Sequence, residues 1–152
     1  MDSFYAAALG EQRWEIALQG LADATGSRSA QLAGIRADKS VAFNTLTNID
    51  PAIPQLFAET AAINPRVLAA NTAPVLKVMA DWDFITPEAC RRDQFCQEIL
   101  QPFDVPFVCL ATLERSDEAF VALAVIRSHR EGHITSEQRQ VFATIAPGTP
   151  QL

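Results

Sequence analysis

Long uncharged apolar runs are missing from this sequence, and no window of about 18 residues is free of charged side chains. A helix that crosses a bilayer needs about 20 mostly apolar residues in succession, so no membrane span is expected. The first residues, MDSFYAAALGEQRW, begin acidic and have no basic region ahead of an apolar stretch. A secretory signal peptide needs such a basic region, so none is expected.

Basic residues and cysteines are also scarce. The chain has 12 Lys and Arg against 18 Asp and Glu, which gives a formal net charge of -6. Because binding to a nucleic-acid backbone needs clustered Lys and Arg, these residues are not expected to bind DNA or RNA directly. The cysteines are few and odd in number: Cys90, Cys96 and Cys109. Their pattern predicts reduced thiols and a cytoplasmic location, not a disulfide framework.

Motifs that would indicate a cofactor, a metal or a catalytic site are missing as well. The six glycines form no phosphate-binding loop, and no G-x-S-x-G elbow is present. His129 and His133 lie four apart in HREGH, but Gly132 favours a turn over the helix of a zinc hydrolase. Cys90 and Cys96 alone cannot complete a tetrahedral zinc site. We therefore expect no cofactor, no metal and no enzymatic activity, and a small hydrolase is the third hypothesis.

What the chain does have is a long amphipathic and β-rich pattern. Its 152 residues, 49% of them apolar, are enough for one domain with a core. A first helix, capped by Ser3 and ended by Gly26, is expected from an apolar stripe at helical spacing. That stripe consists of Trp14, Ala17, Leu18, Leu21 and Ala22. Residues 29–36 and 41–48 alternate as two strands of a hairpin.

Prolines in the middle of the chain indicate where helices begin and end. Asp50-Pro51 predicts the start of a helix over residues 51–63, which should end before Asn64-Pro65. Residues 66–75 are expected to be irregular or to form one short turn. Thr86-Pro87 repeats the signal of a capping residue followed by proline, and it predicts a helix to about Leu100.

The intervening stretch VLKVMADWDF, residues 75–84, predicts an edge strand with Asp81 and Asp83 in water. In that strand Leu76, Val78, Ala80, Trp82 and Phe84 would point inward. A short helix also fits the spacing. In a functional alternative, Trp82 forms the wall of a cavity and one aspartate fixes a polar group of a ligand. A catalytic carboxylate pair is disfavoured, because both carboxylates would be exposed to solvent and would lack the different surroundings that raise the pKa of one of them.

Residues 105–113 and 119–127 are apolar on both faces, which predicts central strands covered on each side. Thr135 and Gln138 form a capping box, which opens a last helix with Val141, Phe142 and Ile145 on one face. The helix is expected to end at Pro147.

The element order predicts an α+β fold with roughly five strands in a mostly antiparallel sheet. This order resembles PAS- and GAF-like domains. The resemblance implies that the N- and C-terminal helices cover one face of the sheet. The middle helices would arch over the other face and enclose a cavity. The domain is expected to span residues 1–147, with residues 148–152 as a tail.

A second resemblance rests on residues spread along the chain. They are Trp14 with Ala17-Leu18 and Leu21-Ala22, Ala30-Gln31-Leu32, Asn64-Pro65-Arg66, Glu98-x-Leu100-x-Pro102, Leu123 to Arg127, and Arg139 with Phe142, Ile145 and Pro147. Their order and spacing resemble the sensory N-terminal region of LuxR-type helix-turn-helix transcription regulators. In that family the last helix leads through Pro-His-Leu into a DNA-binding domain. Here Pro147-Gly148-Thr149-Pro150 follows, so DNA is expected to be a partner only through a domain outside these residues.

The same resemblance bears on the ligand. Acyl-homoserine-lactone receptors, a more distant group, use the Asp of an Asp-Pro step to hold the ligand amide. Asn64-Pro65 resembles this step with Asn in place of Asp, and Phe57 lies where a ring with a hydroxyl is expected. The resemblance therefore implies a ligand other than a lactone.

We expect a cytoplasmic, homodimeric domain that senses a small molecule and signals through its first and last helices. The expected walls of the ligand site are Trp82, Phe95, Phe107 and Phe120, and the expected polar anchors are Asn64, Arg66 or Asp83. Arg66 has an alternative role, in which it ties down its own loop. The alternative for the whole domain is a dimerisation module without a ligand. A cavity of roughly 300 Å³ or more under Trp82 would favour sensing, and a solid interior would favour dimerisation.

Overall fold

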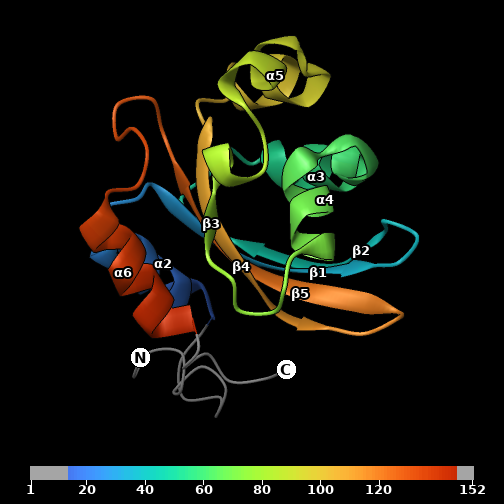
Figure 1. Ribbon diagram of the computed structural model, residues 1–152, viewed down its shortest axis with the longest axis horizontal. Helices are drawn as coiled ribbons and strands as arrows, with labels where there is room; N and C mark the ends of the chain where they lie inside the picture. The colour runs from blue at the N-terminus through green and yellow to red at the C-terminus, as the bar shows by residue number, and fades with distance from the viewer. Residues whose placement is uncertain (1–13, 147–152) are drawn as a thin grey trace.

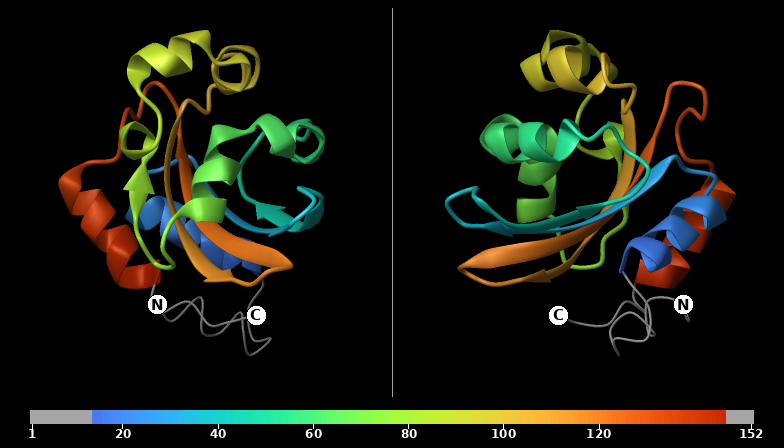
Figure 2. Two further views of the ribbon diagram at one scale, coloured as in Figure 1. Left: turned by 45° about the vertical axis from the view of Figure 1, so that its right-hand side comes forward. Right: turned by 180° about the vertical axis from the view of Figure 1, so that it is seen from behind.

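The computed structural model describes residues 14–146. Its centre is one antiparallel sheet of five strands in the order β2-β1-β5-β4-β3, with helices on both faces (Figures 1 and 2). The strands are β1 (Ser29–Arg36), β2 (Val41–Leu46), β3 (Met79–Ala80), β4 (Phe107–Arg115) and β5 (Ala119–Arg127). The predicted α+β class with five mostly antiparallel strands is confirmed.

Two hairpins and one long pairing build the sheet. β1 and β2 form the first hairpin, and β4 and β5 form the second. β5 then pairs with β1 along eight residues, from Ser29 opposite Ile126 to Arg36 opposite Ala119. This pairing places β5 and β1 inside the sheet. β4 and β5 are apolar on both faces because both strands are covered on each side, as predicted.

The helices α2 (Trp14–Ala24) and α6 (Ser136–Ile145) lie side by side on one face of the sheet (Figure 2). The buried side of this layer contains Leu18, Leu21 and Phe142, which pack against alternate residues of β1, β4 and β5. Gly26, at φ 63°, follows the end of α2 as predicted. Ser3 and Pro147, the predicted outer limits of the two helices, lie outside the described residues.

The start of α6 is the predicted capping box. Thr135 Oγ1 accepts a hydrogen bond from the Gln138 backbone N–H at 3.1 Å, and Gln138 Oε1 accepts one from the Thr135 backbone N–H at 3.0 Å. Both backbone donors would otherwise have no partner within the helix. The cap therefore sets where α6 begins and how it enters the layer beside α2.

The opposite face of the sheet carries the middle helices. They are α3 (Ile53–Thr60), the 3₁₀ turn η1 (Ala61–Ile63), α4 (Pro65–Thr72), α5 (Pro87–Arg92) and the short π-helix η3 (Cys96–Leu100). α3 and η1 lie within the predicted helix over 51–63, but α3 begins after Asp50-Pro51. The carboxylate of Asp50 accepts a hydrogen bond from the Ala52 N–H at 2.8 Å, ahead of the first turn.

Two predictions about these helices are wrong. Residues 66–75 were expected to be irregular or to form one short turn, whereas α4 is regular for two turns, because Asn64 Oδ1 caps it by accepting from the Arg66 N–H at 2.9 Å. The predicted helix from Thr86 to Leu100 is in fact two pieces. Asp93 is extended between them, and its carboxylate accepts from the Cys96 N–H at 2.9 Å, which starts a new turn.

The prediction of a regular edge strand over residues 75–84 is also wrong. Only β3 pairs, at the edge beside β4 as expected, and the 3₁₀ turn η2 (Asp81–Asp83) follows it. Leu76 has a left-handed backbone, with φ 67°, and this interrupts the expected alternation. As a result Asp81 is buried and Trp82 is 46% exposed, the reverse of the predicted arrangement.

Strict alternation along the strands separates two cores. In β1, Ala30 and Leu32 belong to the core under α2 and α6, whereas Ala33 and Ile35 belong to the core under the middle helices. The same alternation runs through β4 and β5. The helices among residues 14–146 include none that is long and apolar enough to cross a bilayer.

Candidate functional site

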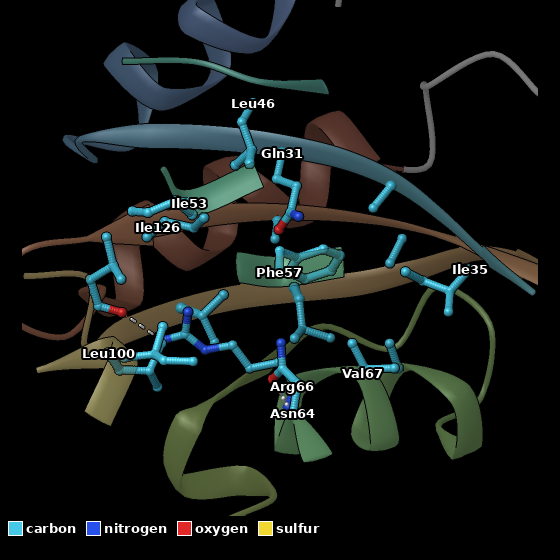
Figure 3. Close-up of a pocket in the computed structure, with 18 of the residues that line it drawn as sticks. Gln31, Ile35, Leu46, Ile53, Phe57, Asn64, Arg66, Val67, Leu100 and Ile126 are labelled. Carbon is cyan, nitrogen blue, oxygen red and sulfur yellow. Dashed lines mark hydrogen bonds between the residues drawn. The ribbon is translucent and has the colours of Figure 1, made fainter. Parts of the chain in front are cut away.

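A cavity of about 70 Å³ lies between the sheet and the middle helices (Figure 3). Its floor consists of strand residues that face away from α2 and α6: Gln31, Ala33, Ile35, Leu46, Val108, Leu110, Phe120, Ala122, Ala124 and Ile126. Its cover comes from the segments that arch over the sheet: Ile49, Ile53, Phe57, Asn64, Arg66, Val67, Ala70, Phe95, Ile99, Leu100 and Val105. The predicted cavity under the middle helices is therefore present.

Only three of the lining residues are polar, and they lie on two walls. Gln31 projects from β1, whereas Asn64 and Arg66 come from the start of α4 on the opposite side (Figure 3). The Gln31 side chain donates to Asn44 Oδ1 at 2.8 Å, so its amide oxygen is turned toward no described donor. The remainder of the lining is apolar. An apolar cavity with a few aimed polar groups is the usual form of a small-molecule site.

Arg66 supplies the only charge on the cavity lining. Its Nη2 donates to the Val105 carbonyl at 2.9 Å, and the nearest carboxylate oxygen is Asp81 Oδ1, 3.7 Å from Nη2. Only 12% of the Arg66 side chain is exposed. Burial lowers the pKa of the guanidinium from its ordinary value, and the negative charge of Asp81 opposes that effect.

Asp81 lies behind Arg66 and is buried between η2 and β4. Its Oδ2 accepts from the Val108 N–H at 2.8 Å, which joins η2 to the start of β4. Burial raises the pKa of the Asp81 carboxyl above its ordinary value, while Arg66 acts in the opposite direction. Asp81 itself does not line the cavity, so it acts on the site through Arg66.

The structure brings together four of the seven predicted site residues. Asn64, Arg66, Phe95 and Phe120 all line the cavity. The alternative role, in which Arg66 ties down its own loop, is not the contact observed. Its hydrogen bond goes to the Val105 carbonyl, 39 residues further along the chain, and connects α4 to the segment before β4.

The other three predicted residues, Trp82, Asp83 and Phe107, lie outside the cavity, and their predicted place in its wall is wrong. The ring centroids of Trp82 and His133 are 4.7 Å apart, and those of Phe107 and His133 are 4.1 Å apart. Asp83 bonds to Arg139 of α6 at 2.8 Å and accepts from the Ala80 N–H at 2.9 Å. The turn η2 directs Trp82 and Asp83 away from the middle helices. Phe107 lies on the face of β4 shared with Cys109 and Ala111, which is the face under α2 and α6.

Two polar residues, Gln31 on the cavity lining and Asp81 behind Arg66, were not among the predicted polar anchors. Gln31 carried a usable signal, because it shares the inward face of its strand with Ala33 and Ile35 and is the polar member of that face. Asp81 carried none. Its burial depends on the Val108 N–H, which lies 27 residues further along the chain.

Within the part of the chain that the structure describes, no three His, Cys, Asp or Glu side chains are placed to hold a metal ion. His129 and His133 lie in the predicted turn, and His129 Nδ1 is 2.8 Å from Asp104. The arrangement at the cavity is suited to holding a ligand by one charged group and an apolar wall.

Comparison with known proteins identifies a similar fold but no matching family. The sequence matches none of the family models and none of the curated proteins with which it was compared. Among solved structures, the chain is similar to the VqsR LBD domain from Pseudomonas aeruginosa, with TM-score 0.68 and 13% identity, over 89% of this chain and 80% of that one.

Two GAF domains are also similar in structure. The GAF domain/HD domain protein from Geobacter sulfurreducens aligns with TM-score 0.53 and 11% identity, over 86% of this chain and 83% of that one. The GAF domain of the cyanobacteriochrome TePixJ aligns with TM-score 0.54 and 13% identity, over 88% and 82% of the two chains. At these identities the likeness shows a shared GAF-like fold.

Proposed function

We propose that this chain is the ligand-sensing domain of a cytoplasmic transcription regulator of the LuxR type, without catalytic activity. The observation that carries the proposal is the cavity, which is apolar except for Gln31 and the Asn64–Arg66 end. The likeness to the LBD domain of VqsR supports the sensing part of the proposal, and the resemblance of the sequence to LuxR-type regulators supports the rest. The proposed domain spans residues 1–147 and takes a small molecule as its partner.

The proposed output surface is the layer of α2 and α6 on the far face of the sheet. A second copy of the chain would pack there, and the ligand would favour one packing of the two copies. A ligand can shift such an equilibrium only by binding the two states unequally. Arg139 supports a connection between the faces, since it donates to the Val78 carbonyl, just before β3, and to Asp83, in the same turn as Asp81. DNA would be contacted by a separate domain, because a net charge of -6 opposes direct binding.

The proposal is tested by thermal shift of the purified chain against a broad metabolite library. Ala124, which lines the cavity, offers a filling variant, Ala124→Leu, that places protein atoms where a ligand would lie. Ala42→Leu makes the same change at an exposed position of β2 and serves as the control. Compounds that stabilise the wild type and A42L, but not A124L, are the expected result. A library without any such compound would remove the sensing function.

The dimerisation module remains a second candidate because of one observation. The cavity of about 70 Å³ is smaller than the roughly 300–1,000 Å³ of typical drug-sized sites. It nevertheless exceeds the roughly 10–15 Å³ that one water molecule needs. If sedimentation shows a dimer whose dimerisation affinity is the same with every library compound, this candidate is favoured. A dimer affinity that depends on a bound compound would favour sensing.

A further inference from the structure

The Arg66 guanidinium has more hydrogen-bond donors than partners. It carries five N–H groups in a planar fork. Among residues 14–146 it makes one hydrogen bond, from Nη2 to the Val105 carbonyl, and the Asp81 oxygen at 3.7 Å lies beyond hydrogen-bond distance. Its Nε is buried and has no partner among the described residues. Buried donors without acceptors are rare in folded proteins, because they lose their water without compensation.

Asn64 adds a second donor at the same end of the cavity. Its Oδ1 is occupied as the cap of α4, where it accepts from the Arg66 N–H at 2.9 Å. Its amide Nδ2 forms no hydrogen bond with any described residue, although the side chain is buried and lines the cavity. This end of the cavity therefore offers donors from two adjacent residues and lacks an acceptor to match them.

The charge on the lining has one sign. Among residues 14–146 no Asp or Glu lines the cavity, so an ammonium group would find no carboxylate partner there. A planar carboxylate, in contrast, fits the fork of an arginine and accepts two parallel hydrogen bonds. The other walls are aliphatic or aromatic apart from Gln31. The site is thus complementary to a molecule with a carboxylate at one end and an apolar body.

Building on the sensing function, we propose that the ligand is a small aliphatic carboxylate, held by Arg66 and Asn64. The volume of about 70 Å³ is about five times the roughly 10–15 Å³ that one water molecule needs, which limits the body to a short chain. The carboxylate accepts hydrogen bonds from Arg66 and from Asn64 Nδ2, and the alkyl chain lies over the floor formed by the strands.

Asp81 is the internal competitor for Arg66. Its Oδ1 faces the guanidinium and its Oδ2 is bound to the Val108 N–H at 2.8 Å, so it partly neutralises the arginine in the empty site. Asn at position 81 keeps an oxygen for Val108 and removes the negative charge. The inference therefore predicts opposite effects of the two partners: binding weakens when Arg66 is replaced and tightens when Asp81 becomes Asn.

The test is titration of the ¹⁵N-labelled chain with butyrate and isovalerate, followed by NMR of the backbone, the arginine Nε–H and the Asn side-chain amides. Butyramide, 1-butanol and butylamine are the matched ligands that lack the carboxylate. The variants are Arg66→Gln, Arg66→Lys and Asp81→Asn, and Arg36→Gln is the control, since Arg36 is exposed at the end of β1. We expect carboxylates to bind at least tenfold tighter than the matched ligands. Arg66→Gln should weaken binding at least tenfold, and Asp81→Asn should tighten it severalfold.

Equal binding of butyramide and butyrate, or unchanged butyrate binding in the Arg66→Gln variant, would overturn the carboxylate assignment. If Arg66→Gln does not fold, Arg66→Lys and Asp81→Asn decide. Unchanged affinity in both overturns the assignment, and weaker binding in the first with tighter binding in the second supports it. Binding of an uncharged library compound but of no carboxylate would overturn the assignment and leave sensing intact. A chain that binds no compound of either set would remove both.

Discussion

Arg66 and Asp81 face each other with Nη2 and Oδ1 3.7 Å apart, although one begins α4 and the other begins η2. Only 12% and 6% of their side chains are exposed, so neither charge is well hydrated. Val105 and Val108, on either side of the start of β4, supply the other partners of the pair. The two charges therefore join the cover of the cavity to the edge of the sheet.

The first prediction concerns the energetic coupling of this pair. Arg66→Met leaves the Asp81 carboxylate buried without its cation, and we expect a loss of about 3–5 kcal/mol in the free energy of unfolding at neutral pH. The double variant Arg66→Met/Asp81→Asn should recover much of this loss, because no unpaired charge remains buried. Urea unfolding of the four species measures the coupling. Purely additive losses would show that the two side chains are independent.

The second prediction concerns Gly34 and Phe43, which are opposite each other in β1 and β2. The Phe43 ring lies directly over Gly34, so a Cβ there would overlap the ring. Gly34→Ala should therefore cost about 1–3 kcal/mol through overpacking. In the background of Phe43→Ala the same change should cost much less, since the ring is gone. Equal costs in the two backgrounds, measured by urea unfolding, would contradict this contact.

The third prediction follows from the lowered pKa of Asp83. The Ala80 backbone N–H lowers the pKa of this carboxyl below its ordinary 3.8, and Arg139 acts in the same direction. A folded-state pKa below the unfolded one adds stability above the unfolded value and loses it as the pH falls through the folded value. Asp83→Asn should thus cost about 0.2–1 kcal/mol at pH 7.

The difference between wild type and Asp83→Asn should shrink below pH 3.8 and vanish in stronger acid. Urea unfolding across this range gives the comparison. Asp117→Asn, in the exposed turn between β4 and β5, is the matched control for removing one carboxylate. A difference that stays constant down to the lowest pH would exclude the carboxylate charge as its source.

The fourth prediction concerns thiol reactivity. All three cysteines are free, with Cys96 and Cys109 buried and Cys90 partly buried. Burial raises the pKa of Cys109 to about 12 and also raises that of Cys96, which keeps both thiols protonated and unreactive at pH 8. Native protein should therefore lose one thiol to a thiol reagent quickly, and Cys90→Ser should abolish this phase. Fast labelling of a second thiol, seen by mass spectrometry, would contradict the structure.

The extent to which the sequence predicted this fold varies from element to element for physical reasons. β4 and β5 are apolar on both faces, so their central place followed from composition alone. α6 followed from a local capping box, in which Thr135 and Gln138 satisfy each other. Such elements are determined by near neighbours in the chain.

α4 was missed although its signal was present. Asn64-Pro65 is a capping residue followed by proline, the same pattern that predicted the helix at Thr86-Pro87. The turn at Asp81, in contrast, has no local signal that outweighs the alternation around it. It depends on the left-handed backbone of Leu76 and on a distant N–H, and these are tertiary effects. The site residues Trp82 and Asp83 were misplaced for that reason.

The alternation of β1 and β5 has a consequence for how such a domain can diverge. Ala33, Ala122 and Ala124 line the cavity, while their immediate neighbours Leu32 and Leu123 belong to the core under α2 and α6. Replacing these three alanines with larger or smaller residues would change the shape of the cavity and leave the core under α2 and α6 unchanged. The size of the cavity and the packing of the helical layer are thereby encoded in interleaved positions of the same two strands, so one can change during evolution while the other is kept.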